Sequence, residues 1–170
     1  MTRFAFEGDG VVVRFEPDEV AALRDLAGQL DAVLRGGVPE HGEDPVRDRL
    51  FPRAYLDPTE DRAEGDFQSV VHDDLVAAKS EAVAALLGGL EGAADRRGRV
   101  DVRLAPDAVE QWVAALNDVR LAIGVALGVT EDDDDLDPAD PRTPGLATYH
   151  WLTWLQGSLV EVLLGALPEG

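Results

Sequence analysis

The stretch PDAVEQWVAALNDVRLAIGVALG, residues 106–128, decides the fold that this sequence predicts. It opens with a Pro-Asp pair, and its apolar residues recur every three or four positions, which is typical of an amphipathic helix. We expect the apolar side to face a protein core. That side consists of Val109, Trp112, Val113, Leu116, Val119, Ile123 and Leu127.

Two polar side chains fall on or beside this apolar side. Arg120 lies four residues after Leu116 and three before Ile123, and Asn117 is one turn behind it. A buried guanidinium without a partner costs several kcal/mol, so we expect a carboxylate or carbonyl groups to meet it. Glu161, which stands among apolar residues of the last predicted helix, is the first candidate partner.

Asp66 and Glu81 are weaker candidates for the same role. The favoured interpretation is a buried polar clasp between helices that includes Asn117, Arg120 and Glu161. A ligand or partner site at these residues is the alternative, and a third interpretation is an arginine that reaches out to solvent.

The rest of the sequence extends this helix into a mainly α (α+β) fold. We expect a bundle of about four main helices with a small antiparallel sheet of about three strands. A Gly-Asp-Gly turn between two apolar runs predicts a hairpin at the start. The expected strands are 4–6, 11–15 and 99–104, and the other main helices are 17–35, 66–90 and 144–167.

One sequence pattern occurs twice. VVVRFEPDEV, residues 11–20, matches VDVRLAPDAV, residues 100–109, and each predicts a strand followed by a helix that begins at Pro-Asp. Two independent uses of a good strand-to-helix connection would explain the match. The second interpretation is that the two strands are neighbours in one sheet, with their helices on the same face.

Length and composition predict a single domain over residues 1–170. The chain is 45% hydrophobic and 29% charged, which is ordinary for a globular protein. Residues 57–66 are almost all polar, and residues 129–145 are acidic and contain prolines. We expect both segments to be flexible acidic loops.

Charge and cysteine content exclude several classes of function. With 34 acidic and 15 basic residues the formal net charge is −19, so we expect no direct binding of nucleic acid. The absence of cysteine excludes disulfides, thiolate catalysis and zinc–thiolate sites. We find no secretory signal and no stretch of the length and apolarity of a membrane span, so we expect a cytoplasmic protein.

Aromatic residues gather in the last predicted helix. Trp151, Trp154 and Ser158 share one side at helical spacing. Trp and Tyr are enriched both in cores and at subunit interfaces, and core packing is the favoured interpretation. A homodimer through this helix is an open alternative.

Two segments resemble the signature stretches of a small actinobacterial family. They are WVAALNDVRLAIGVALGVTED, residues 112–132, and YHWLTWLQGSLVEVLLGAL, residues 149–167, and DPVRDRLFPRAYLDP, residues 44–58, is also similar. The family is catalogued as a domain of unknown function, is often encoded beside the adaptor ClpS, and includes the AosR-like oxidative-stress regulators. The resemblance implies a cytoplasmic regulatory protein that works through a partner such as a sigma factor.

The resemblance transfers no catalytic, cofactor-binding or metal-binding residue. Cysteines are thought to mediate the response of the redox-sensitive members, and this sequence has none, so that mechanism does not carry over. The acidic run 132–140 lacks the glycine and the final glutamate of an EF-hand loop, so we expect no metal there. His72 and its two following aspartates point in different directions on a helix, so they also predict no metal.

No catalytic motif is present: there is no Walker loop, GxGxxG, GxSxG or HExxH. The sequence therefore favours a noncatalytic regulatory or adaptor protein without a cofactor. We expect it to act on a protein partner with a basic surface. The alternative is a small-ligand sensor or an enzyme with its site near Asn117, Arg120 and Glu161.

Overall fold

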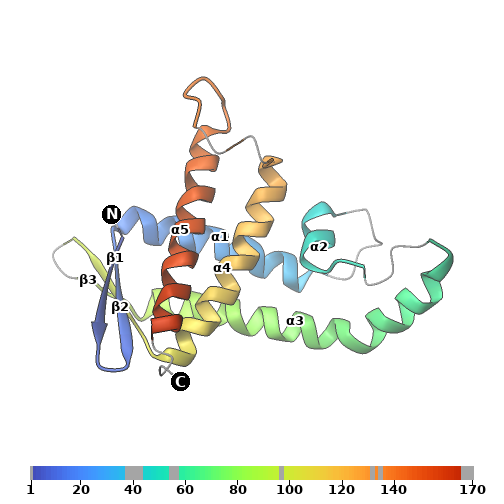
Figure 1. Ribbon diagram of the computed structural model, residues 1–170, viewed down its shortest axis with the longest axis horizontal. Helices are drawn as coiled ribbons and strands as arrows, with labels where there is room; N and C mark the ends of the chain where they lie inside the picture. Colours follow the sequence, from blue (N-terminus) through green and yellow to red (C-terminus); the bar gives the residue numbers. More distant parts are fainter. Residues whose placement is uncertain are drawn as a thin grey trace.

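The computed structural model describes residues 2–36, 44–53, 58–95, 98–130, 133 and 136–165. In these residues the fold is mainly helical with one small antiparallel sheet, as the sequence predicts (Figure 1). The elements in chain order are β1 (Arg3–Glu7), β2 (Gly10–Phe15), α1 (Pro17–Arg35), α2 (Pro45–Leu50), the 3-10 turn η1 (Pro58–Glu60), α3 (Asp61–Glu91), β3 (Ala94–Asp95), β4 (Val100–Leu104), α4 (Pro106–Leu127) and α5 (Thr143–Gly165).

The sheet has the order β1-β2-β4-β3, with every neighbouring pair antiparallel. Its three longer strands match the predicted ones, and the two-residue β3 is an addition that the sequence pattern is too short to reveal. The turn between β1 and β2 contains Gly8 at a φ of 65°, a conformation that favours glycine.

The repeated strand–helix pattern corresponds to neighbouring strands. β2 pairs with β4 over its length, from Val11 opposite Leu104 to Phe15 opposite Val100. The helices that follow these strands, α1 and α4, contribute Leu23 and Trp112 to the same core as Phe15. The second interpretation of the repeat is therefore confirmed.

Helix α4 lies at the centre of the molecule. Its residues contact α1, α2, α3, α5 and β4, and in Figure 1 it forms an antiparallel pair with α5 that crosses α1 and α3. Trp112 is completely buried and stacks on Phe15, with 6.2 Å between the ring centroids. Gly89 of α3 allows this packing, because a Cβ at that position would lie 2.8 Å from Cζ2 of Trp112.

Helix α3 begins earlier than the sequence pattern suggests. Of the segment 57–66, expected to be a flexible acidic loop, residue 57 lies outside the described residues, 58–60 form η1 and 61–66 are the first turns of α3. Acidic side chains stabilise the positive end of a helix, and Asp61 stands in the first turn. Its Oδ1 also accepts a hydrogen bond of 2.6 Å from Arg53.

The completely buried apolar side chains of α3 lie in its second half. Leu86 and Leu90 are completely buried, whereas Val70 is 73% exposed. Successive residues turn by about 100° around a helix, so Val70 and Leu86 lie on nearly opposite sides of α3. The first half of α3 extends away from the sheet, toward the right in Figure 1. The apolar residues of α3 therefore do not form a single side of the helix.

No helix within the described part of the chain is long and apolar enough to cross a membrane.

Candidate functional site

An open pocket of about 830 Å³ lies where α4, α5 and the connection between them meet. Its size is within the usual range for small-molecule sites. The lining combines one cation, one carboxylate, three aromatic or imidazole rings, and hydroxyl groups. The lining residues are Arg120, Val129, Thr130, Asp133, Tyr149, His150, Thr153 and Trp154.

The packing of α4 against α5 positions this pocket. A Cβ on Gly124 would lie 3.2 Å from the Tyr149 ring, and one on Gly145 would lie 2.8 Å from the Leu127 side chain. The two glycines therefore let the helices approach closely at the loop end of the pair. Arg120 lies one turn before Gly124 on α4, further from the loop end of the helix pair.

Arg120 is the only lining residue with a polar atom that is both buried and unpartnered among the described residues. Its Nε is shielded from solvent and has no hydrogen-bond partner in the part of the chain that the structure describes. Buried polar atoms are nearly always paired, and an unpaired one in a folded protein calls for an explanation. In this structure the guanidinium lines a pocket, so an acceptor entering that pocket would find a cation that no described side chain neutralises.

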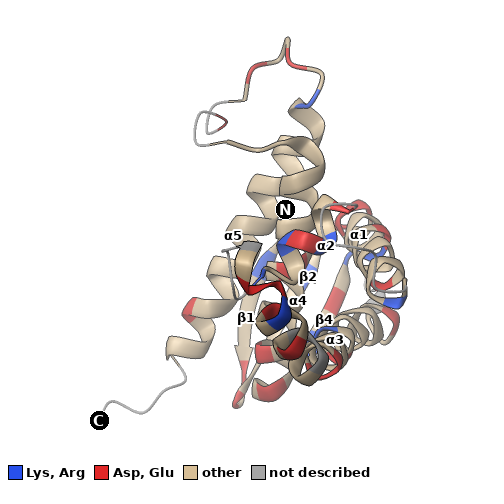
Figure 2. Cartoon of the chain, turned by 90° about the vertical axis from the view of Figure 1, so that its right-hand side faces the viewer, with Lys and Arg blue, Asp and Glu red and all other residues tan. Residues whose placement is uncertain are grey.

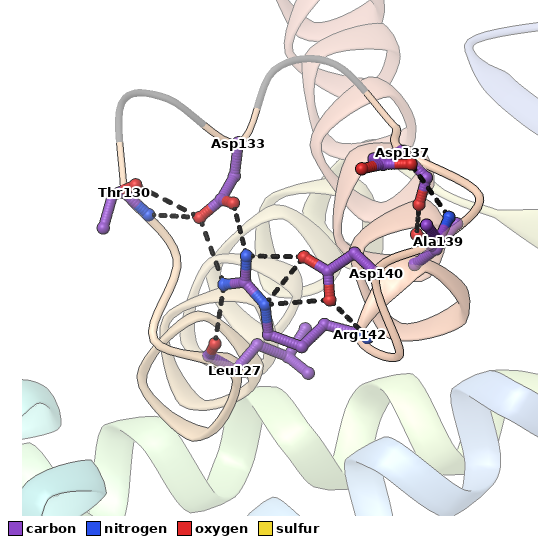
Figure 3. Close-up of polar contacts among 8 residues, drawn as sticks. Leu127, Thr130, Asp133, Asp137, Ala139, Asp140 and Arg142 are labelled. Carbon is purple, nitrogen blue, oxygen red and sulfur yellow. Dashed lines mark hydrogen bonds and ion pairs between the residues drawn. The ribbon is translucent and has the colours of Figure 1, made fainter.

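Arg142 holds the α4–α5 connection together (Figure 3). Its Nη2 donates to Asp133 at 2.8 Å and to Asp140 at 2.7 Å, and its Nη1 donates to the carbonyl oxygen of Leu127 at 3.3 Å. Asp133 also accepts a hydrogen bond of 2.9 Å from the Thr130 backbone. These contacts fix Thr130 and Asp133, two residues of the pocket wall, relative to the end of α4.

The same contacts change the acidity of the loop. Hydrogen bonds from the Arg142 guanidinium lower the pKa of Asp133 and of Asp140 below the ordinary value of 3.8, and the two carboxylates raise the pKa of Arg142. All three groups are therefore charged at neutral pH. The loop cluster carries two negative charges and one positive charge.

The structure does not join Arg120 to Glu161. Glu161 is exposed, and Arg120 forms no hydrogen bond or ion pair among the described residues. Because Gly145 meets Leu127 in an antiparallel pair, Glu161, about four turns further along α5, lies level with the first half of α4. Asn117 is half-buried, and the weaker candidate partners Asp66 and Glu81 are exposed on α3.

The two tryptophans of α5 contact the start of the chain. The indole nitrogen of Trp151 donates to Thr2 Oγ1 at 3.2 Å, and the Trp154 ring packs against Phe4 with 5.8 Å between the centroids. Trp151 is half-buried, whereas Trp154 is 43% exposed and lines the Arg120 pocket. The structure thus places Trp154 beside Arg120, and Trp151 against the N-terminus.

A buried ion pair that the sequence analysis did not predict joins α3 to α4. Asp118 of α4 is 4% exposed and accepts a hydrogen bond of 2.8 Å from Nζ of Lys79 on α3. The ammonium of Lys79 also lies 5.8 Å from the centroid of the Phe51 ring. The sequence contains a signal for this pair. Lys79, the single lysine, lies at helical spacing from Leu86 and Leu90 and therefore on the core side of α3.

An apolar patch is exposed on the first half of α3. We call the outward side chains Phe67, Val70 and Leu75 the α3 patch; they are 38%, 73% and 42% exposed. Phe67 lies between the other two around the helix, because Val70 is turned about 60° to one side of it and Leu75 about 80° to the other. The exposed carboxylates of Asp73 and Asp74 lie beside the patch.

The expectation that the acidic run 132–140 binds no metal falls partly on residues that the structure does not describe. In the acidic run 132–140, residues 132, 134 and 135 lie outside the described part of the chain. The remaining described residues contain no group of three or more metal-ligating side chains. The ring of His72 packs against Phe51, with 5.1 Å between the centroids.

Comparison with known proteins shows which family this sequence resembles. The family described as Domain of unknown function (DUF2017) matches residues 1–163. An AosR protein of Mycobacterium leprae (strain TN) is 31% identical over 178 aligned residues, which cover 87% of this chain and 80% of that protein. The oxidative stress regulator AosR of Mycobacterium tuberculosis (strain H37Rv) is 29% identical over 180 residues, 88% of this chain and 80% of that protein.

No solved structure matches this chain. The family match covers nearly the whole sequence, including both helices that form the Arg120 pocket and the helix that carries the α3 patch. This chain is therefore a member of the DUF2017 family and resembles the AosR proteins of mycobacteria.

Proposed function

We propose that this protein is a noncatalytic cytoplasmic regulator that acts by binding another protein, as an adaptor or in the control of transcription or stress responses. Two observations support this proposal. Its relatives carry the name oxidative stress regulator, and the α3 patch exposes apolar side chains on a helix that extends from the body. The α3 patch is the observation that carries it, because apolar surface of this kind marks interaction sites.

The charge around the α3 patch indicates the charge expected on the partner's surface. Asp73 and Asp74 lie beside it, and the chain as a whole carries a net charge of −19. Figure 2 marks acidic positions in red along α1 and α3. We therefore expect a partner that offers an apolar groove with a basic rim. Complementary charge at the rim would speed association and disfavour acidic proteins as partners. A sigma factor, as the family resemblance implies, would be one such partner.

The experiment starts with a photo-crosslinking amino acid at Val70 in cells of the source organism, followed by identification of the crosslinked protein. The partner is then purified, and its affinity is measured by titration calorimetry at low and moderate salt. We expect stoichiometric binding that weakens with salt. The Phe67→Ser/Val70→Ser variant should bind about tenfold or more weakly, because exposed apolar anchors provide much of an interface's affinity.

The matched control is Leu164→Ser on α5, which changes another exposed apolar side chain, 62% exposed. This variant should bind the partner as the unchanged protein does. Binding that is lost in the α5 variant and kept in the α3 variant would contradict the proposed surface. If Val70 crosslinks only to a second copy of the chain, the surface is a homodimer interface, and light scattering at two concentrations would show the doubled mass.

A further inference from the structure

The pocket at Arg120 has the features of a site for a small anion. Arg120 presents a cation that no described side chain neutralises, and its Nε is buried without a partner. Because this Nε is shielded from solvent, a ligand in the open pocket would meet the rest of the guanidinium, whose two terminal nitrogens can donate parallel hydrogen bonds to a planar oxyanion. We propose that this pocket binds a small monoanionic carboxylate with an aromatic or other flat apolar body. The proposal concerns a different surface from the α3 patch and does not depend on it.

The walls of the pocket favour the apolar body. Tyr149, His150 and Trp154 all line it, and Trp154 is held in place by its contact with Phe4. Large flat side chains of this kind bind rings by stacking, at a small cost in conformational entropy. The volume of about 830 Å³ accommodates a molecule larger than a single inorganic ion.

The charges near the pocket favour a monoanion over a phosphate. Asp133 belongs to the wall, and with Asp140 it supplies two negative charges against the single positive charge of Arg142. Their pKa values are lowered, so both carboxylates remain charged at neutral pH. A dianion would meet this residual negative charge and the overall charge of −19, whereas a monoanion needs only the Arg120 guanidinium.

Three other polar residues of the lining have their own hydrogen-bond partners. Both carboxylate oxygens of Asp133 accept hydrogen bonds from Arg142, and Thr130 donates to Asp133. The hydroxyl of Thr153 donates to the carbonyl oxygen of Tyr149. Among the described lining residues, Arg120 is the cation that lacks a polar partner, and it determines which end of the ligand enters.

The test compares 2-naphthoate with its neutral analogue 2-naphthamide by titration calorimetry on the full chain. Inorganic phosphate, at a mildly alkaline pH where it is mostly the dianion, serves as the dianion probe. We expect naphthoate to bind with one-to-one stoichiometry and the amide to bind about tenfold or more weakly, as the loss of a charge-assisted hydrogen bond implies. Phosphate should not show saturable binding. Equal binding of carboxylate and amide, preferential binding of phosphate, or no saturable binding of naphthoate would each overturn the proposal.

Variants locate the site. Arg120→Leu should reduce naphthoate affinity about tenfold or more, since it removes the cation. The matched control Arg103→Leu removes an exposed arginine that pairs with Glu7 on the sheet and should leave the affinity unchanged. Thr153→Tyr fills the pocket from an exposed position of α5 and should also abolish binding, which keeps the test decisive if Arg120→Leu unfolds. Binding that survives Thr153→Tyr would place the ligand elsewhere and refute the assignment.

Discussion

Among single residues, Lys79 is expected to contribute most strongly through one contact. Its ammonium neutralises Asp118, whose side chain is only 5% exposed. Lys79→Ala would leave that carboxylate buried without a partner, so the free energy of unfolding should fall by about 3 kcal/mol. Urea denaturation followed by circular dichroism measures this loss.

An exposed ion pair provides the control for Lys79. Arg35 pairs with Asp31 one turn away, and its side chain is 79% exposed, so Arg35→Ala should cost about 0.5 kcal/mol or less. The double variant Lys79→Met/Asp118→Leu should recover most of the loss, because two apolar groups need no charge partner. Similar effects of Lys79→Ala and Arg35→Ala would show that the buried pair has no special role.

The acidic side chains of the α4–α5 connection predict a response to pH. The pKa values of Asp133 and Asp140 are lowered below 3.8 by Arg142, so these groups stabilise the folded loop above that pH. The contribution is lost as the pH falls through their lowered pKa values. Carbon-detected NMR titration of the two carboxyl groups should therefore give midpoints below 3.8 in the unchanged protein.

The Arg142→Ala variant is the reference for this titration. It removes the guanidinium that lowers both pKa values, so the two midpoints should rise toward 3.8. Midpoints that do not move in the variant would mean that another group causes the shift.

The sequence identified Arg120 as unusual but not its surroundings. A polar residue on an apolar side is visible from helical spacing, whereas its neighbours depend on how α4 and α5 are aligned. That alignment follows from the close contacts at Gly124 and Gly145, which spacing does not reveal. Asp118 was missed for a related reason: α4 is covered on several sides, so a residue away from the main apolar side can also be buried.

At the scale of elements, two neighbouring glycines near the end of α3 should respond in opposite ways to substitution. Gly88 is exposed with open space around it, so Gly88→Ala should stabilise the protein by about 0.5 to 1 kcal/mol through helix propensity. Gly89→Ala places a Cβ 2.8 Å from the buried Trp112 ring and should destabilise the protein by about 1 kcal/mol or more. Thermal unfolding of the two variants side by side measures the difference.

The Gly88→Ala variant is itself the control for general effects of alanine on α3. Equal stabilisation by both substitutions would mean that Trp112 can move away at little cost. Nε1 of Trp112 is buried and has no partner among the described residues, so none of them fixes the position of the ring by a hydrogen bond. The result would therefore separate steric packing from helix propensity at this contact.

Most elements could be predicted from the sequence because each has a local signal. Apolar runs around a Gly-Asp-Gly turn predicted β1 and β2, the repeated pattern at residues 100–109 fits β4, and Pro-Asp starts predicted α1 and α4. The start of α3 has a weaker signal, since its first turns are polar and apolar periodicity begins only near Phe67. The direction of its apolar residues could not be predicted, because it depends on where the core ends along the helix.

For the molecule as a whole, charge predicts that nucleic acid is not a ligand. The net charge of −19 repels a phosphate backbone, and nonspecific affinity for DNA requires cationic groups. Fluorescence anisotropy with a mixed-sequence duplex at low salt should show no saturable change. Clear binding that weakens steeply with added salt would contradict this expectation and point to a local cluster of arginines.

The global arrangement was only partly accessible from the sequence. The repeated strand–helix pattern correctly suggested that β2 and β4 are neighbours, because two similar units pack well side by side in one sheet. The central place of α4 and the projection of α3 depend on contacts between distant segments. These contacts leave no regular spacing in the sequence.

The projection of α3 also has a consequence for how the protein fluctuates. Its last turns are anchored by Leu86 and Leu90 in the core, whereas the turns around Val70 expose apolar side chains to solvent. Helical segments with few buried contacts open more readily than those packed in a core. Amide hydrogen exchange should therefore be faster around Val70 than around Leu86, within one continuous helix. A partner that orders the faster half would leave a protection footprint there, whatever its identity.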